Sequence, residues 1–195
     1  MSSTFRIPKA RITGLYGRVL AGITKRMWGK IPDNAYVLWH NRRVLNGVLG
    51  FERSATKWNR LDPQLATFAE MAVAGAIGCS WCLDFGYYMA HRSGLDLEKV
   101  REVPRWRGSD AFSSLERDVL EYAEAATATP PTVDDAIVTR LVEALGAPAM
   151  VELTQLIGLE NMRSRFNFAA GLESQGFSDV CEVPWAKADA VASAS

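Results

Sequence analysis

Residues 70–91, EMAVAGAIGCSWCLDFGYYMAH, are the stretch of sequence that decides the fold. The run is mostly apolar and continues a helix that begins at Asp62-Pro63, where aspartate suits the N-cap and proline the first helical position. Gly78 interrupts this helix, because glycine readily adopts the left-handed conformation that ends helices. A second helix is then expected from Ser80 to Ser93. The stretch therefore predicts two consecutive helices that meet at Cys79.

Helices separated by short breaks are expected along the rest of the chain, and no segment has the alternating pattern of a strand. Helical spacing and capping signals place further helices at about residues 12–23, 35–53, 97–103, 113–127, 132–145 and 148–167. We therefore predict an all-α protein with a single domain, a helical bundle formed by residues 35–180. Residues 1–34 are expected to form a basic amphipathic helix and a linker, and residues 181–195 a disordered tail.

The composition is that of an ordinary globular protein. Hydrophobic residues make up 48% of the 195 residues and charged residues 23%, which is enough for one core of usual size. The 22 basic and 22 acidic residues cancel, so the charge does not indicate nucleic acid or an anionic membrane as partner. The basic helix in residues 1–34 is expected to pack on the domain or on a neighbouring subunit; a membrane-surface or targeting helix is the alternative. Without a secretory signal or a membrane-spanning apolar run, the expected location is the cytoplasm.

Two of the three cysteines form a C-x-x-C motif, Cys79 and Cys82, whereas Cys181 lies far away in the sequence. At the start of a helix, unpaired backbone N–H groups and the helix dipole favour the thiolate, so the motif suggests a redox-active dithiol. The alternative is a pair of small, inert cysteines in the core. A zinc site is not expected, because His40 and His91 are the only histidines and no second cysteine pair supplies further ligands.

Helical periodicity sorts the residues that follow the motif onto two faces. Cys79, Cys82 and Gly86 share one face if the helix is continuous from Cys79. Asp84 and His91 share a different face, so they are candidates only for supporting roles. Position 86, where a base for Cys82 would be best placed, is a glycine. His91 is therefore expected at the surface or the helix end, and Asp84 in a cap, a local hydrogen bond or a subunit contact.

Other polar residues are candidates for the same site. Glu70 stands in an apolar run, so it is a candidate acid or base near the thiols; the alternative is an exposed position on its helix. His40 is a further candidate for a supporting role, with packing or capping as the favoured interpretation. Arg163 and Arg165 beside Glu160 are interpreted as an ion-pair set between helices or subunits, with binding of an acidic substrate as the alternative.

The stretch from Leu61 to Gly94 resembles the AhpD-like and carboxymuconolactone decarboxylase family, in which a helix that carries a glutamate leads into Gly-Cys-x-x-Cys and a second helix. Residues 115–127, 151–154 and 161–167 resemble the later helices of these proteins. The resemblance extends from about Trp39 to Gly171 and implies an AhpD-like helical architecture. It also implies a homo-oligomer, a trimer or a hexamer, with the site near a subunit interface.

In AhpD-like peroxidases the family chemistry is the reduction of a hydroperoxide by the dithiol. The resemblance thus implies a thiol-dependent antioxidant oxidoreductase. Cys82 would attack the peroxide and Cys79 would resolve the sulfenic acid, although the residues also allow the reverse order. No bound cofactor and no metal are implied, but a thioredoxin-like or lipoamide-type dithiol would be needed as the reductant.

Two positions depart from the peroxidase pattern. The histidine that follows the second motif cysteine by four residues is Gly86 here, and the glutamate twelve residues before the first is Thr67. Glu70, one helical turn later, is the candidate to replace that glutamate. The departures leave two alternatives open: a non-catalytic oligomeric scaffold or small-molecule binding protein, and a lyase or isomerase that acts on a small ring compound.

Overall fold

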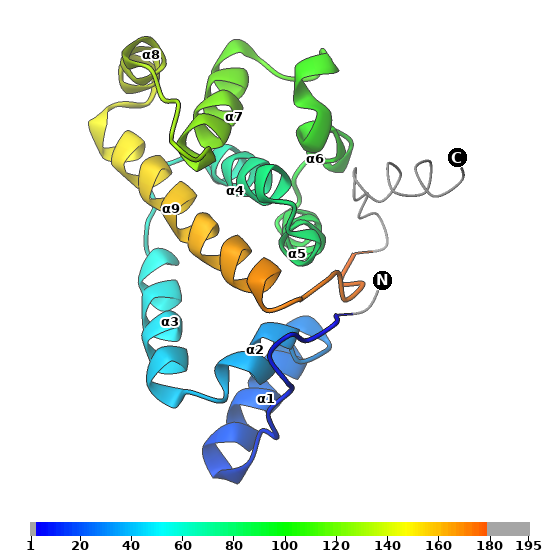
Figure 1. The fold of residues 1–195 in the computed structure, drawn as a ribbon. Helices are drawn as coiled ribbons and strands as arrows, with labels where there is room; N and C mark the ends of the chain where they lie inside the picture. The colour runs from blue at the N-terminus through cyan, green and yellow to red at the C-terminus, as the bar shows by residue number, and fades with distance from the viewer. Residues whose placement is uncertain (1–2, 179–195) are drawn as a thin grey trace.

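The computed structural model describes residues 3–178, and every regular element in that part of the chain is helical (Figure 1). The all-α prediction is therefore confirmed. The predicted tail, residues 181–195, lies outside the described residues. The helices are α1 (Gly14–Trp28), α2 (Asp33–Leu38), α3 (Arg42–Ala55), α4 (Pro63–Ile77), α5 (Ser80–Arg92), α6 (Leu97–Glu102), the 3-10 helix η1 (Val103–Gly108), α7 (Ser114–Thr127), α8 (Asp135–Leu145) and α9 (Ala147–Ala169).

Helix α4 lies at the centre of the bundle, in contact with α9, α7 and α5 (Figure 1). Phe68 and Val73 are fully buried in it, and so are the small residues Ala69, Ala72 and Ala74. A helix with apolar residues on all sides, rather than in one stripe, is stable in water only when other helices surround it. Helices α5 and α9 also contact each other. Side chains from α4, α5 and α9 can therefore meet at one place.

The junction of α4 and α5 forms as the sequence predicts. Oδ1 of Asp62 accepts hydrogen bonds from two backbone N–H groups in the first turn of α4. At the other end, Gly78 has a φ of 82°, the left-handed conformation that glycine adopts without steric cost. The N–H of Cys79 donates to the carbonyl of Ala74, and Cys79 is itself the N-cap of α5. The chain thus passes from one helix to the next at the first motif cysteine.

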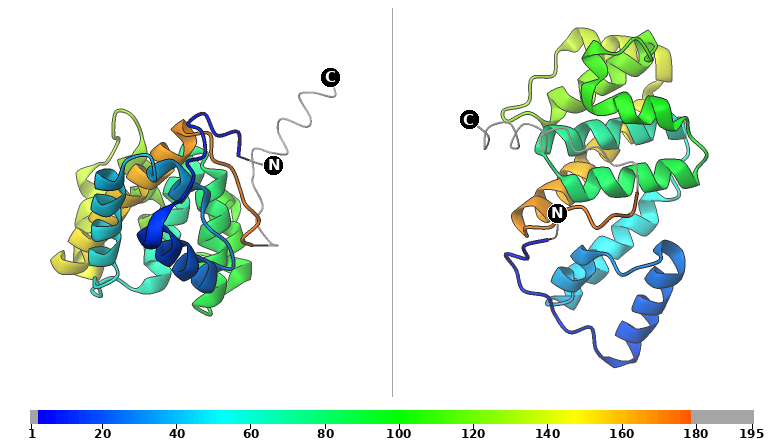
Figure 2. Two further views of the ribbon diagram at one scale, coloured as in Figure 1. Left: turned by 90° about the horizontal axis from the view of Figure 1, so that it is seen from below. Right: turned by 90° about the vertical axis from the view of Figure 1, so that its right-hand side faces the viewer.

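Helices α1 to α3 form an N-terminal arm that lies beside the α4–α9 bundle (Figure 2). The segment before α1 is tied to the end of α9, because the N–H of Arg6 donates to the carbonyl of Ala170. The side-chain oxygen of Gln175 accepts hydrogen bonds from the N–H of Asp33, at 2.7 Å, and from Nε1 of Trp81, at 2.8 Å. Gln175 therefore connects the N-terminal arm, the segment after α9 and helix α5.

Helix α1, Gly14–Trp28, lies in the segment for which the sequence predicts a basic amphipathic helix. Its apolar side chains Leu15, Val19 and Ile23 are 72%, 50% and 48% exposed in the single chain. Basic residues, Lys25 and Arg26, occupy its last turn, where they complement the helix dipole. Among residues 3–178, no helix is both long and apolar enough to cross a membrane.

Candidate active site

The two motif cysteines lie together at the N-terminus of α5, and both are free thiols. Sγ of Cys79 accepts a hydrogen bond from the backbone N–H of Cys82 at 3.2 Å, as an N-cap side chain does. Cys79 is 1% exposed and Cys82 8% exposed. The motif therefore presents two adjacent sulfur atoms at a buried helix start.

The environment of Cys82 differs from the sequence-based expectation of a stabilised thiolate. Burial raises the pKa of the Cys82 thiol well above its usual value, and the contact with Cys79 and the negative charge of Glu160 raise it further. A hydrogen bond with Ser164 opposes these effects only in part. The backbone N–H at the helix start donates to Sγ of Cys79 rather than to Cys82, so the loss of solvent dominates at Cys82. At rest Cys82 is therefore a neutral thiol that needs a base to become a nucleophile.

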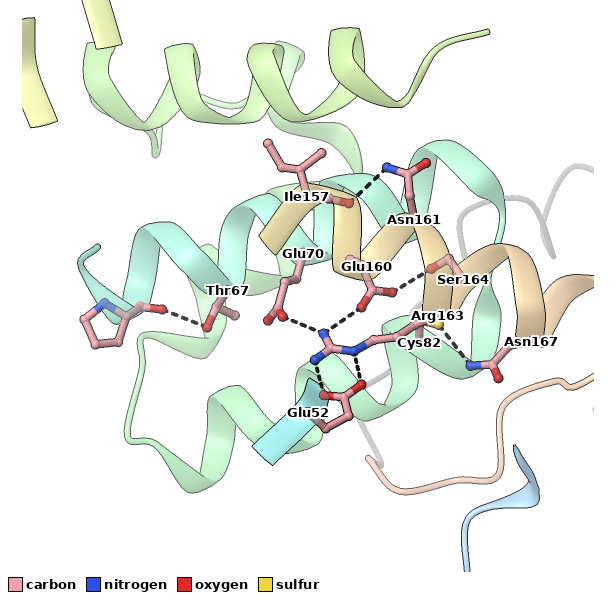
Figure 3. A network of polar contacts seen from close by, with 11 residues as sticks. Glu52, Thr67, Glu70, Cys82, Ile157, Glu160, Asn161, Arg163, Ser164 and Asn167 are labelled. Carbon is pink, nitrogen blue, oxygen red and sulfur yellow. Dashed lines mark hydrogen bonds and ion pairs between the residues drawn. The ribbon is translucent and has the colours of Figure 1, made fainter. Parts of the chain in front are cut away.

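Helix α9 supplies three polar side chains that face Cys82 (Figure 3). Glu160, Ser164 and Asn167 follow each other at i, i+4 and i+7, which places them on one side of a helix. The hydroxyl of Ser164 donates to Oε1 of Glu160 at 2.6 Å, and Nδ2 of Asn167 donates to Sγ of Cys82 at 3.3 Å. All three are buried. The thiol thus faces a carboxyl, a hydroxyl and an amide.

Glu160 is the ionisable group best suited to exchange a proton with Cys82. Burial raises its pKa to about 7, and the charge of Glu70 raises it as well, whereas Arg163 and the hydroxyl of Ser164 lower it. A group that gains and loses its proton near neutral pH is well matched to general acid and base catalysis. The carboxyl of Glu160 therefore has the chemical property that the neutral thiol requires.

Arg163 holds the carboxylates behind this site in a single ion-pair cluster (Figure 3). Its guanidinium binds Glu52 of α3 through two nitrogens and lies 2.7 Å from Oε1 of Glu70 and 3.2 Å from Oε2 of Glu160. Burial opposes the charge of Arg163, but the hydrogen bonds to Glu52 and the charges of the two other carboxylates raise its pKa, so it stays protonated. The interpretation as an interhelix ion-pair set is correct for Arg163, which pairs with Glu52 of α3 and Glu70 of α4, whereas its pair with Glu160 lies within α9.

The other predicted site residues lie in different parts of the fold, and the hydrogen bonds that they make go to groups other than the two thiols. Glu70 is half-buried, and its hydrogen bond goes to Arg163, which links it to Glu160. Asp84 is fully buried, and its oxygens accept hydrogen bonds from three backbone N–H groups of residues 175–178. His91 is exposed in the last turn of α5, and His40 is exposed with Nε2 2.7 Å from the carbonyl of Pro8. Asp84 thus anchors the segment after α9, and Glu70 belongs to the cluster behind the thiols.

The two positions that depart from the peroxidase pattern have different surroundings. A Cβ on Gly86 would lie 3.1 Å from Cγ of Met71, so a histidine there would have to displace a buried side chain. The hydroxyl of Thr67 donates to the carbonyl of Pro63 in its own helix. Neither position supplies an acid or a base to the dithiol.

Ser164 and Asn167 are not among the site residues predicted from the sequence, and Glu160 is predicted there only as a member of an ion pair. Their i, i+4, i+7 spacing was the available signal, because polar residues in such a row within a buried helix need a common polar neighbour. The signal is hard to read in the sequence, because the exposed Arg165 stands between Ser164 and Asn167. In addition, apolar and polar residues are not clearly separated onto two sides of α9. Only the packing of α9 against α5 shows which side of the helix matters.

A pocket of about 640 Å³ opens beside the dithiol segment. Its lining consists of Ala76, Ile77, Glu124, Thr127, Ala128, Thr129, Arg165 and Phe168. Ile77 immediately precedes Gly78, and a ring atom of Phe168 lies 3.9 Å from where a Cβ on Gly78 would be. The pocket therefore borders the junction that carries Cys79, although neither sulfur lines it. No cluster of His, Cys, Asp or Glu within residues 3–178 is arranged to hold a metal ion.

Comparison with known proteins identifies the family. Residues 43–125 match the carboxymuconolactone decarboxylase family. The uncharacterized protein YnjA of Escherichia coli strain K12 is 41% identical over 170 residues, which cover 87% of this chain and 85% of the relative.

Two solved structures share the fold at low sequence identity. A cysteine-to-alanine variant of the debrominase Bmp8, in complex with 2,3,4-tribromopyrrole, has a TM-score of 0.75 at 18% identity, over 97% of this chain and 99% of that chain. A protein of unknown function from Agrobacterium tumefaciens, proposed to be the antioxidant defence protein AhpD, has a TM-score of 0.64 at 19% identity, over 68% and 91%. These likenesses establish the AhpD-like fold. With the family match and the identity to YnjA, they show that the chain belongs to the carboxymuconolactone decarboxylase family.

Proposed function

We propose that this protein is a dithiol oxidoreductase that reduces hydroperoxides through Cys79 and Cys82. One observation supports the proposal: Glu160, a buried carboxyl whose pKa burial raises to about 7, lies near the buried Cys82 thiol, on the face of α9 from which Asn167 binds the sulfur. Inert core cysteines would not need a carboxyl beside them, because an ionisable group is costly to bury. The site therefore combines a nucleophile, a proton acceptor and a second thiol.

The first step is the attack of Cys82 on the peroxide. Glu160 accepts the thiol proton while the sulfur bonds to one peroxide oxygen and the O–O bond breaks. The leaving alkoxide then takes the proton from Glu160 and departs as an alcohol. The sulfur is oxidised to the sulfenic acid by two electrons, the peroxide is reduced by two, and Glu160 returns to its starting state.

The second step is the attack of Cys79 on the sulfenic sulfur of Cys82. A disulfide forms between the two cysteines, and the hydroxyl leaves with the Cys79 proton as water. A small dithiol or a thioredoxin-like protein then reduces the disulfide by exchange, which restores both thiols. The hydrogen bond from the Cys82 N–H to Sγ of Cys79, which keeps the two cysteines adjacent, supports Cys79 as the resolving thiol.

A second substrate class draws on the likeness to the debrominase Bmp8, which covers nearly the whole chain. Replacement of an aryl halogen by hydrogen also consumes two electrons, which the two thiols can supply as they become a disulfide, with release of the hydrogen halide. Glu160 can supply the proton that this replacement needs. We therefore propose halogenated small aromatic compounds as the alternative oxidant for the same dithiol.

We further propose that the protein acts as a homo-oligomer, a trimer or a hexamer. Three large apolar side chains, Leu15 of α1 with Val151 and Phe168 of α9, are 72%, 69% and 52% exposed in the single chain. Burial of each would contribute roughly 1.5–3 kcal/mol, which favours association. Phe168 also borders the pocket, so a neighbouring subunit at this residue would narrow the approach to the dithiol.

The proposal is tested by the stoichiometry of thiol oxidation. The protein is reduced, freed of reductant and treated with cumene hydroperoxide in the Cys181→Ser background, where only the motif thiols remain. We expect one Cys79–Cys82 disulfide per peroxide consumed, detected by mass spectrometry of the unreduced peptide. Glu160→Gln should slow this reaction about 100-fold at pH 7.5, because the base is gone. 2,3,4-Tribromopyrrole is tested in parallel, with bromide release as the readout.

The controls separate chemistry from folding. Cys82→Ser should abolish peroxide consumption, whereas Cys79→Ser should consume one equivalent and stop at the sulfenic acid. Glu98→Gln removes an exposed carboxylate and should leave the rate unchanged. A reduced wild-type protein that forms no disulfide with either oxidant would rule out the proposed oxidoreductase and leave the binding-protein alternative.

A further inference from the structure

We infer that Asn167 is a catalytic residue of the dithiol site: its amide nitrogen stabilises the Cys82 thiolate, and its amide oxygen accepts a hydrogen bond from the hydroxyl of the sulfenic acid. The inference rests on the proposed function. Asn167 is 1% exposed, and its Nδ2 lies 3.3 Å from Sγ of Cys82 (Figure 3). Its Oδ1 is also buried and has no hydrogen-bond partner among the residues that the structure describes.

The unpartnered oxygen is the first reason for this assignment. Buried polar atoms are almost always paired, because an unpaired one loses its hydrogen bonds to water and gains none in exchange. A leucine of similar size would fill the same space without that cost. Asn167 therefore keeps an acceptor that the resting protein does not use, next to the sulfur at which the reaction would create a new donor.

The second reason is that the hydrogen bond from Nδ2 of Asn167 to Sγ of Cys82 becomes stronger when the thiol ionises. A neutral thiol is a weak acceptor, whereas a hydrogen bond to an ionised acceptor is roughly twice as strong as a neutral one. The Nδ2 donor thus stabilises the thiolate more than the thiol. The charged group next to Cys82 is Glu160, whose carboxylate disfavours the thiolate, and Arg163 and Glu70 lie behind it. Asn167, whose Nδ2 already donates to the sulfur, is a neutral group that counters this repulsion.

The oxygen end of the amide becomes useful after the attack. When the Cys82 sulfur bonds to a peroxide oxygen and the alcohol leaves, the product Cys82–S–O–H has a hydroxyl donor that the thiol lacked. That hydroxyl is one bond from Sγ, and Oδ1 belongs to the amide group that already contacts Sγ. The hydrogen bond from the sulfenic hydroxyl to Oδ1 satisfies the buried oxygen and holds the intermediate until Cys79 attacks.

Two measurements test the two ends of the amide, with Asn167→Ala and Asn167→Asp in the Cys181→Ser background. The pH dependence of Cys82 alkylation by iodoacetamide, assigned by mass spectrometry, tests the nitrogen. We expect the midpoint to rise by about one pH unit in Asn167→Ala, from the loss of a hydrogen bond to a charged group. In Asn167→Asp it should rise further, because a carboxylate of the same shape repels the thiolate.

The lifetime of the sulfenic acid tests the oxygen. In Cys79→Ser the intermediate cannot be resolved, and its decay after one equivalent of cumene hydroperoxide is followed by trapping with dimedone. We expect Asn167→Ala to shorten this lifetime about tenfold, the effect of losing one hydrogen bond of about 1.4 kcal/mol. The matched control is Asn161→Ala, because Asn161 lies on the same helix but donates to Thr127 and Ile157 instead of a thiol.

Each outcome decides a different statement. If Asn167→Ala and Asn161→Ala have the same alkylation midpoint, the role of the nitrogen is wrong, whatever happens with peroxide. If the midpoint shifts but the sulfenic lifetime does not, the role of the oxygen is wrong. If the wild-type dithiol does not react with peroxide at all, the proposed function and the role of the oxygen fail together, and the alkylation profile alone decides the role of the nitrogen.

Discussion

A Cβ on Gly86 would lie 3.1 Å from Cγ of Met71, a side chain that is 1% exposed in α4. The space that the histidine of the peroxidase motif would need is thus already filled by a neighbouring helix. The carboxyl of Glu160 faces the same cysteine from α9 instead. The absence of a histidine at position 86 and the presence of the Glu160 carboxyl beside Cys82 are therefore two features of the same site.

Introducing the histidine of the peroxidase motif at position 86 should therefore destabilise the protein instead of supplying a base. Gly86→His should lower the free energy of unfolding by about 1–3 kcal/mol, because overpacking forces Met71 and its neighbours to move. Urea unfolding at pH 7 measures the change. Gly75→Ala is the control for the glycine itself, since a Cβ there meets nothing within 4 Å and should stabilise α4 by up to about 1 kcal/mol. A Gly86→His variant as stable as the wild type and faster with peroxide would show that position 86 has room for a base.

The buried carboxyl of Glu160 should make stability depend on pH. Its folded pKa of about 7 lies above the usual value of 4.5, so the folded state binds the proton more tightly than the unfolded state. Its contribution is greatest below about pH 4.5 and is lost as the pH rises through about 7. Glu160→Gln cannot ionise, so its stability relative to the wild type should increase by about 3 kcal/mol between pH 4.5 and pH 8. Urea unfolding curves at both pH values measure this difference, and a constant difference would contradict the burial of an ionisable group.

Glu70 should act on the reaction through Glu160. Its charge raises the pKa of Glu160, so Glu70→Gln should lower that pKa and move the acidic limb of the peroxide reaction to lower pH. The rate of disulfide formation is measured between pH 5 and pH 8. Glu98→Gln, which removes a carboxylate that is 83% exposed, should leave the profile where it is. Loss of the reaction at every pH in Glu70→Gln would instead indicate that Glu70 is itself the acid or base.

Arg163 should be among the most sensitive positions in the protein. Arg163→Met leaves Glu52, Glu70 and Glu160 without their shared cation. Removal of one partner from a buried ion pair costs about 3–5 kcal/mol, and because only Glu160 is buried here, we expect a loss of about 3 kcal/mol. The matched control is Arg140→Met, because Arg140 is 51% exposed and its pair with Asp118 should contribute at most about 1 kcal/mol. Thermal and urea unfolding of both variants give the comparison. Equal losses would mean that the cluster is far more hydrated than its burial indicates.

Local rules of sequence were sufficient to predict the α4–α5 junction. Asp62, Gly78 and Cys79 act on backbone groups within a few residues of themselves, so their effect does not depend on the rest of the fold. The helix start at Cys79 could be predicted because it depends only on nearby residues. The raised pKa of Cys82 could not be predicted in the same way. A helix terminus is a local property, whereas the burial that raises the pKa of Cys82 is a property of the whole bundle.

The sequence by itself therefore determined the all-α class, the helix boundaries around the motif and the pairing of two thiols at one helix start. Only the tertiary structure decided which acid, amide and hydroxyl face those thiols. Cys82 and Asn167 are 85 positions apart and meet because α9 packs beside α5, with α4 in contact with both helices. Contacts of this kind depend on how apolar faces of several helices fill the core together, and no short segment of sequence contains that information.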